Sequence, residues 1–170
     1  YQADDIEGAI LEFKTALRLD PSNVNVHNSL GVCFGVLGQL EKAQDAFITA
    51  YELDHRETMA IYNNGLAHLL LENKEKALEL FMEAYAQDKD IFEISFQIGK
   101  LYQETGQFEK ALKFLEKSIR LNPAASPAYR LLGQCHAGAG QAKNAIRAYK
   151  NAIKYNPNDA ASLSALGCLF

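Results

Sequence analysis

The residues best suited by type to do chemistry lie at 133–140, where the sequence reads Gly-Gln-Cys-His-Ala-Gly-Ala-Gly. A glycine-rich stretch of this length suggests a cradle for a phosphate group. A phosphate-binding loop, however, needs Lys and then Ser or Thr directly after its last glycine. Gln141 and Ala142 occupy those two positions in this chain. We therefore do not expect this stretch to bind phosphate.

Cys135 and His136 are neighbours that suggest a nucleophile with its base, or two metal ligands. Adjacent residues on a helix point about 100° apart, so these two side chains do not converge on one ligand. His27, His55 and His68 show no metal-ligand spacing, and the three cysteines show no Cys-x-x-Cys spacing. The sequence thus predicts no catalytic residues, no metal site and no cofactor, and we do not expect an enzyme.

Most of these residues belong instead to a repeat of 34 residues. Three columns of this repeat keep their chemistry along the whole chain: Gly31, Gly65, Gly99, Gly133 and Gly167; Ala9, Ala43, Ala77, Ala111 and Ala145; Phe13, Phe47, Phe81, Leu115 and Tyr149. Apolar residues three and four apart indicate helices. Small residues let two helices approach closely, and an aromatic ring fills the space beside them. Each unit is therefore predicted to be a helix A, a tight turn and a helix B.

The turn of the unit at 58–91 departs from this pattern. Gly38, Gly106 and Gly140 hold the turn position in three units, whereas Glu72 holds it in this one. A tight turn after a helix commonly needs one residue in the left-handed conformation, which glycine and asparagine adopt most easily. Asn73, the next residue, is of a type that can adopt that conformation.

These columns resemble those of the tetratricopeptide repeat, a helix–turn–helix unit of about 34 residues. The resemblance covers all 170 residues and is strongest over 126–159. It implies an all-α fold, an α-solenoid in which about ten helices form a right-handed superhelix, within a single domain. Full repeats are expected at 24–57, 58–91, 92–125 and 126–159, with a helix B at 1–23 and a helix A at 160–170. The two partial repeats together make one period, so we expect a fragment of a longer array.

Composition excludes several classes of function. A net charge of −4 argues against nonspecific binding of nucleic acid, which normally requires a basic protein. No apolar run approaches the roughly 20 residues that a membrane helix needs, so no membrane partner is expected. Three cysteines without paired spacing are typical of structural thiols in a reducing cytoplasm.

The resemblance further implies that the A helices line a concave groove. The groove positions of the second full repeat are unusually apolar, and Phe96 from the third extends the patch. Exposed apolar patches usually mark binding sites. The apolar candidates are Met59, Tyr62, Leu66, Leu69, Leu70 and Phe96. The polar candidates, expected to hold a peptide backbone or an acidic group, are Asn28, Asn63, Gln97, Lys100, Arg130 and Gln134. The alternative is that some of the leucines pack between helices.

The groove favours a noncatalytic module for protein–protein interaction, which binds a peptide or a helix. One alternative is a structural scaffold that assembles through end-to-end or convex contacts. Another is an array that presents substrates to a catalytic domain elsewhere in a longer protein. End-to-end assembly would place apolar residues from the two ends of the chain in contact. These are Ile6, Ile10 and Phe13 at one end and Leu163, Leu166 and Phe170 at the other.

Overall fold

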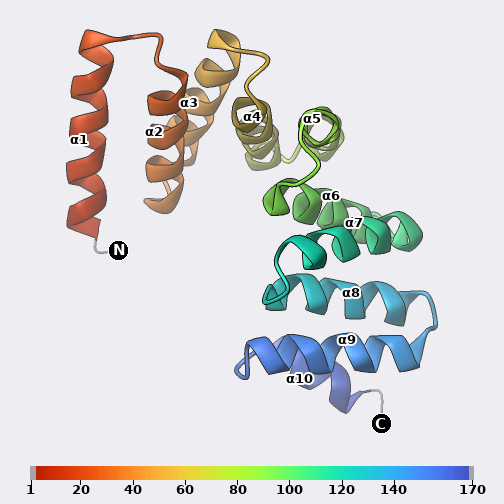
Figure 1. Cartoon of the computed structure of the whole chain (residues 1–170). Helices are drawn as coiled ribbons and strands as arrows, with labels where there is room; N and C mark the ends of the chain where they lie inside the picture. The colour runs from red at the N-terminus through yellow and green to blue at the C-terminus, as the bar shows by residue number, and fades with distance from the viewer. Residues whose placement is uncertain (1–2, 169–170) are drawn as a thin grey trace. The chain divides into compact units, whose positions relative to one another are not determined.

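The computed structural model describes residues 3–168, and their side chains from residue 5 onward. These residues form ten helices joined by short turns and contain no strand (Figure 1). The predicted class, an all-α α-solenoid, is confirmed. The chain divides into two compact units, residues 1–87 and 88–170, which are described separately.

The first unit holds five helices that alternate in direction. They are α1 (Ala3–Leu19), α2 (Val24–Val36), α3 (Leu40–Leu53), α4 (Thr58–Leu70) and α5 (Lys74–Gln87). Each of these helices packs against the next one along the chain, and α2 also packs against α4. This contact between α2 and α4 aligns two A helices along one face of the unit.

The second unit repeats this arrangement with α6 (Phe92–Glu104), α7 (Phe108–Leu121), α8 (Ser126–Gly138), α9 (Ala142–Tyr155) and α10 (Ala160–Gly167). The antiparallel pair α8 and α9 lies side by side in Figure 1, and α6 also packs against α8. Ser126 ties α8 to α9, because its buried hydroxyl donates a 3.0 Å hydrogen bond to the carbonyl oxygen of Ala152.

The glycine column marks the places where helix A and helix B of one repeat cross. A methyl group added at Gly133 would lie 2.6 Å from Cε1 of Tyr149, closer than side chains approach one another. Gly65 is related in the same way to Phe81. Each ring packs directly against the backbone of a glycine, and this is the packing that the repeated columns of the sequence predict.

The turn of the second full repeat contains a strained residue. Gly38, Gly106 and Gly140 have φ values of 70°, 72° and 73°, and Glu72 has a φ of 57°. The left-handed residue of this turn is thus Glu72, and not the asparagine beside it. The side chain of Asn73 accepts a 3.1 Å hydrogen bond from the backbone N–H of Lys76, which caps the start of α5. Because Asn73 serves as a cap, the left-handed conformation falls on Glu72.

Candidate functional site

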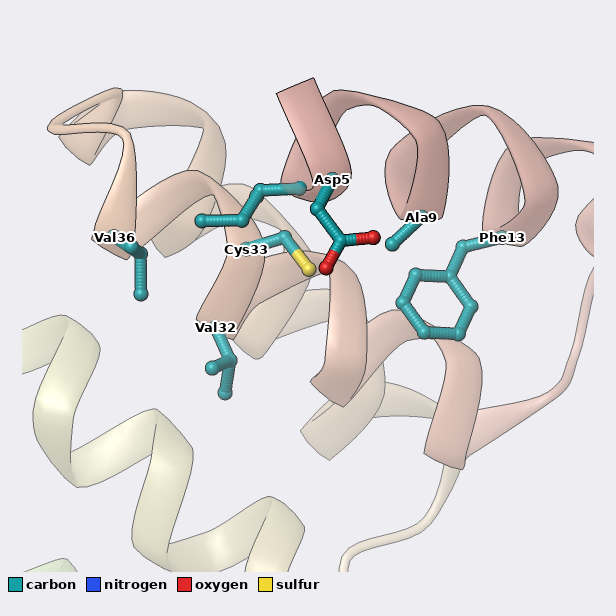
Figure 2. A pocket seen from close by; sticks show the side chains of 7 residues that line it. Asp5, Ala9, Phe13, Val32, Cys33 and Val36 are labelled. Carbon is teal, nitrogen blue, oxygen red and sulfur yellow. The ribbon is translucent and has the colours of Figure 1, made fainter. Parts of the chain in front are cut away.

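Two apolar cavities open on the first unit. Cavity I, of about 410 Å³, lies between α1 and α2 and is lined by Asp5, Ile6, Ala9, Phe13, Val32, Cys33 and Val36 (Figure 2). Cavity II, of about 420 Å³, lies between α2, α3 and α4 and is lined by Gly31, Val32, Gly35, Val36, Leu40, Ala43, Phe47, Leu66, Leu69 and Leu70. Val32 and Val36 line both cavities, so one face of α2 separates them.

Cavity II is hollow because of the small residue at position 35. A Cβ atom added to Gly35 would meet nothing within 4 Å. The same column holds Leu69 one repeat later and Gln103 two repeats later. A larger side chain at this position would project into the cavity, and its absence leaves the space open.

The side chains around cavity II are apolar and largely exposed. Val32 is 52% exposed, Val36 66% and Leu40 49%, and Leu70 on the facing helix is 39% exposed. Apolar side chains gathered around one opening are characteristic of surfaces that bind other molecules. Cavity II therefore has the form of a site for an apolar side chain.

The apolar residues predicted from the second full repeat fall into two groups. Leu66, Leu69 and Leu70 line cavity II. Met59 is 37% exposed on α4 but does not line either cavity. Tyr62 is buried, and its ring centroid lies 5.4 Å from that of Phe81, so its ring belongs to the packing between α4 and α5.

The two asparagines predicted to hold a ligand pair with each other. Nδ2 of Asn63 donates a 2.9 Å hydrogen bond to Oδ1 of Asn28, and both side chains are buried. A buried amide that lacks a partner is costly, so this pairing stabilises the contact between α2 and α4. The structure thus gives these residues a role in holding the two A helices together.

The other predicted residues lie in the second unit and are described within it. Phe96 is half-buried on α6 and stacks on Phe92 with ring centroids 5.6 Å apart. Lys100 on the same helix and Gln134 on α8 are exposed. Gln97 is half-buried, and its Oε1 has no hydrogen-bond partner among the described residues.

Arg130 connects α8 to the start of α10. Its Nη1 lies 3.8 Å from Oδ1 of Asp159, which is buried. The carboxylate of Asp159 also accepts hydrogen bonds from the backbone N–H and the hydroxyl of Ser162, and so caps α10. Arg130 therefore has an intramolecular partner in the second unit.

At the place in the second unit that corresponds to cavity II, an aromatic ring lies beside α8. Phe108 and Gly138 stand two repeats after Leu40 and Leu70. A Cβ atom added to Gly138 would lie 2.5 Å from the ring of Phe108, so that ring covers the space beside α8. The second unit thus fills with one ring the space that the first unit leaves open.

The sequence analysis did not select Val32, Gly35, Val36 and Leu40 as site residues. Their signal was the apolar pair four residues apart on one helix face, with a glycine between the two. All four positions lie in the first full repeat, and three of them stand one repeat before the selected residues Leu66, Leu69 and Leu70. A comparison of side-chain size down each column would have indicated the cavity.

The apolar residues expected at the two ends differ in exposure. Ile6 and Phe13 line cavity I, whereas Ile10 is buried in the core between α1 and α2. Leu163 on α10 is 49% exposed and Leu166 is half-buried. Phe170 lies outside the described residues. End-to-end assembly could therefore use Ile6 and Phe13 but not Ile10.

Cys135 and His136 do not form a reactive pair. Cys135 is completely buried, and burial raises the pKa of its thiol to about 11, so the thiol stays protonated at neutral pH. Nδ1 of His136 lies 2.8 Å from Oε1 of Gln141, across the turn. In the described part of the chain, no group of three His, Cys, Asp or Glu side chains is arranged to hold a metal ion.

None of the helices among residues 3–168 combines the length and the apolar character that crossing a bilayer requires.

Three family models match the sequence. A model described as TPR repeat matches residues 1–35, and two models described as tetratricopeptide repeat match residues 92–124 and 126–159. No curated protein sequence matches the chain significantly.

Several solved structures share the fold. The chain in the crystal structure of the MamA protein is 27% identical in sequence, with a TM-score of 0.73. The match covers 92% of this chain and 86% of the MamA chain. YrrB, described as a TPR protein with an unusual peptide-binding site, is 23% identical with a TM-score of 0.74, covering 95% of this chain and 84% of its own. The structure described as the APC/C hetero-tetramer Cut9–Hcn1 is 19% identical with a TM-score of 0.84, and the match covers 98% of this chain and 33% of the Cut9–Hcn1 chain.

Proposed function

Because this chain is a tetratricopeptide repeat array, we propose that it is a noncatalytic interaction module that binds a peptide or a helix through apolar side chains at cavity II. The observation that carries this proposal is an open apolar cavity bordered by Val32, Val36 and Leu70, all exposed. Grooves that hold peptides combine apolar anchors with a rigid frame. The Asn28–Asn63 hydrogen bond supports the rigidity of this frame.

The volume of cavity II, about 420 Å³, lies within the roughly 300–1,000 Å³ that is typical of ligand pockets, so it has room for at least one anchoring side chain. Burying a leucine or phenylalanine side chain contributes about 1.5–3 kcal/mol. A ligand that inserts one such group and covers the neighbouring valines would gain several times that amount before the costs of association are subtracted. Because association costs at least about 4 kcal/mol, we expect weak binding, with dissociation constants in the millimolar to micromolar range.

YrrB supports the proposal only as an example of the fold. Its printed description assigns a peptide-binding site to that protein. At 23% identity the likeness extends to the arrangement of helices and not to the residues of a site. The proposal for this chain rests on its own cavity.

The test uses peptides selected from a random 12-residue library displayed on phage. Gly35→Leu should place a side chain in cavity II, because Gly35 lines this cavity and nothing lies within 4 Å of a Cβ atom at this position. Ala137→Leu, in the same column on α8, is the matched control because Ala137 is exposed. We expect selected peptides to bind Gly35→Leu at least about tenfold more weakly than the control. Equal binding to the two variants would refute the proposal.

A second candidate function is a scaffold that assembles end to end. It is supported by the exposure of Leu163 on α10 and by the open cavity beside Ile6 and Phe13. Sedimentation velocity at increasing protein concentration tests it, with Leu163→Glu as the variant that should remain monomeric.

Three free thiols, at Cys33, Cys135 and Cys168, support a reducing compartment such as the cytoplasm.

A further inference from the structure

Cavities I and II are related by the 34-residue repeat. The walls of cavity I formed by Ile6, Ala9 and Phe13 correspond, one repeat later, to Leu40, Ala43 and Phe47 in cavity II. Val32 and Val36 line both cavities, because they lie four residues apart on the face of α2 between them. The two cavities, here called the sockets, therefore share one wall on α2, and their B-helix walls on α1 and α3 occupy the same positions of the repeat.

The distance between the sockets limits the ligand. The B-helix walls of the two sockets are offset by one repeat, and the A helices of successive repeats, α2 and α4, pack against each other. Packed helices have axes about 8–10 Å apart. In a polyproline II peptide, residues three apart project from the same side and are separated by about 9 Å. An extended peptide with apolar residues at positions i and i+3 thus matches the two sockets.

The charge at the sockets selects a basic ligand. Among the described residues that line the two cavities, Asp5 is the only charged one. Figure 2 shows its carboxylate pointing into the space between Cys33 and Phe13. Residues 1–87 include 14 acidic and 6 basic residues, so the first unit is acidic. Residues 88–170 include 7 acidic and 11 basic residues. A local carboxylate within an acidic unit attracts cationic ligands over a long range.

A second copy of this chain is a weaker occupant of cavity I. The apolar segment that it would offer is α10, which has the sequence Ala-Ala-Ser-Leu-Ser-Ala-Leu-Gly over residues 160–167. This helix carries no basic side chain to meet Asp5, and it begins at the acidic cap Asp159. The charges thus favour a different partner.

We propose that cavities I and II together bind an extended basic peptide, with two apolar side chains three residues apart in the two sockets and an arginine or lysine beside Asp5. This inference rests on the proposed function, since cavity II is one of its two sockets. It adds cavity I, the spacing of the anchors and the charge of the partner. It also makes Asp5 the residue that distinguishes a basic peptide from an acidic one.

Fluorescence anisotropy with three synthetic peptides tests this inference. The basic probe has the sequence Gly-Arg-Leu-Pro-Pro-Leu-Arg-Gly. An acidic probe replaces both arginines with glutamates, and a short probe, Gly-Arg-Leu-Pro-Leu-Arg-Gly, moves the two leucines one residue closer. We expect the basic probe to bind about tenfold more tightly than either of the others at low salt. Its advantage over the acidic probe should shrink as the salt concentration rises.

Two substitutions that change the net charge by the same amount test whether the preference for the basic peptide depends on Asp5. Asp5→Lys should weaken binding of the basic probe by about two- to fivefold or more, as expected for a solvent-exposed ion pair whose sign is reversed. Glu7→Lys changes the net charge equally at an exposed position on the same helix that lines neither cavity. It should have a smaller effect. Equal effects of the two variants, equal binding of the three peptides, or no binding at millimolar peptide would each overturn the inference.

The same measurements separate this inference from the proposed function. If all three peptides bind equally and Gly35→Leu weakens them all, the inference fails and the proposed function stands. If Gly35→Leu leaves the binding of every peptide unchanged, the proposed function fails as well. If the chain self-associates and Asp5→Lys strengthens that association, cavity I receives a second copy of the chain, and the inference is overturned.

Discussion

The same cleft is hollow in the first unit and filled in the second. In the first unit, Leu40 and Leu70 stand at the opening of cavity II, and Gly35 leaves its interior empty. In the second unit, the corresponding pair is Phe108 and Gly138, and the ring of Phe108 lies against the glycine. The backbone pattern is the same, and the sizes of a few side chains decide whether a site exists.

This difference separates two kinds of glycine on one helix. Gly31 belongs to the column that repeats, and it is buried against the ring of Phe47. Gly35 belongs to a column that varies, and it faces open space. The first kind maintains the crossing of two helices, and the second kind provides volume for a ligand. Repetition in the sequence therefore identifies the scaffold, and variation identifies the site.

The largest effect is expected from substituting these two glycines separately. Gly31→Ala would drive a methyl group into the ring of Phe47, which is buried, so it should destabilise the protein by about 2 kcal/mol. Gly35→Ala should stabilise it by about 0.5–1 kcal/mol, because alanine favours the helix and meets no neighbour. Urea unfolding of both variants measures the difference, and equal free energies of unfolding would contradict the distinction.

Exchanging the side chains that distinguish the hollow cleft from the filled cleft should affect stability in the second unit and peptide binding in the first. Phe108→Leu removes part of the ring that fills the second unit and should cost about 1–2 kcal/mol of stability. Leu40→Phe adds a ring at the opening of cavity II, where Leu40 is half exposed, and should leave stability nearly unchanged while weakening peptide binding. Thermal unfolding and peptide titration of each variant check these outcomes. Loss of stability in Leu40→Phe would show that cavity II has no room for the ring.

Glu72 offers a smaller gain in stability. A residue other than glycine in the left-handed conformation costs about 1–2 kcal/mol, and glycine removes this cost at some expense in chain entropy. Glu72→Gly should therefore stabilise the protein by about 0.5–1 kcal/mol. The matched control, Gly106→Glu, places the same residue in the equivalent turn, where φ is 72°, and should destabilise by a similar amount. Chemical denaturation of both variants provides the test.

The reactivity of the cysteines provides a comparison of the two units that requires no substitution. Cys33 and Cys135 occupy one column, three repeats apart. Cys33 is half-buried and lines cavity I, whereas Cys135 is fully buried with a pKa raised to about 11 by desolvation. At pH 8 only about one in a thousand Cys135 thiols is ionised, so a thiol reagent should modify Cys168 first, Cys33 next and Cys135 only after unfolding. Mass spectrometry at timed intervals follows the order, and early modification of Cys135 would contradict it.

The fold was predictable from the sequence because its constraints are local and recur. Gly65 opposite Phe81 and Gly133 opposite Tyr149 both require a small residue and a ring at a fixed separation. Each repeat states that requirement again, so the columns are visible without an alignment of relatives. The turn at Glu72 was less predictable, because capping by Asn73 competes with the preference of asparagine for the left-handed conformation.

The candidate site was predictable only in part, because exposure depends on contacts between repeats. Leu66, Leu69 and Leu70 were selected for their apolar character, and all three line cavity II. Tyr62 has the same apolar character but is buried against Phe81, and the sequence does not distinguish the two environments. In addition, no single residue type indicates a cavity, because a cavity is space that the surrounding side chains leave empty. The cavity at Gly35 appears only when the sizes of the neighbouring side chains are known.

Methyl NMR spectroscopy tests the central claim, that cavity II is a binding site, most directly. The protein would carry labelled valine and leucine methyl groups and would be titrated with a peptide selected on the wild-type chain. We predict that the largest shifts occur at Val32, Val36 and Leu70, and that Gly35→Leu abolishes them while Ala137→Leu does not. Largest shifts in the second unit, or shifts that persist in Gly35→Leu, would contradict it.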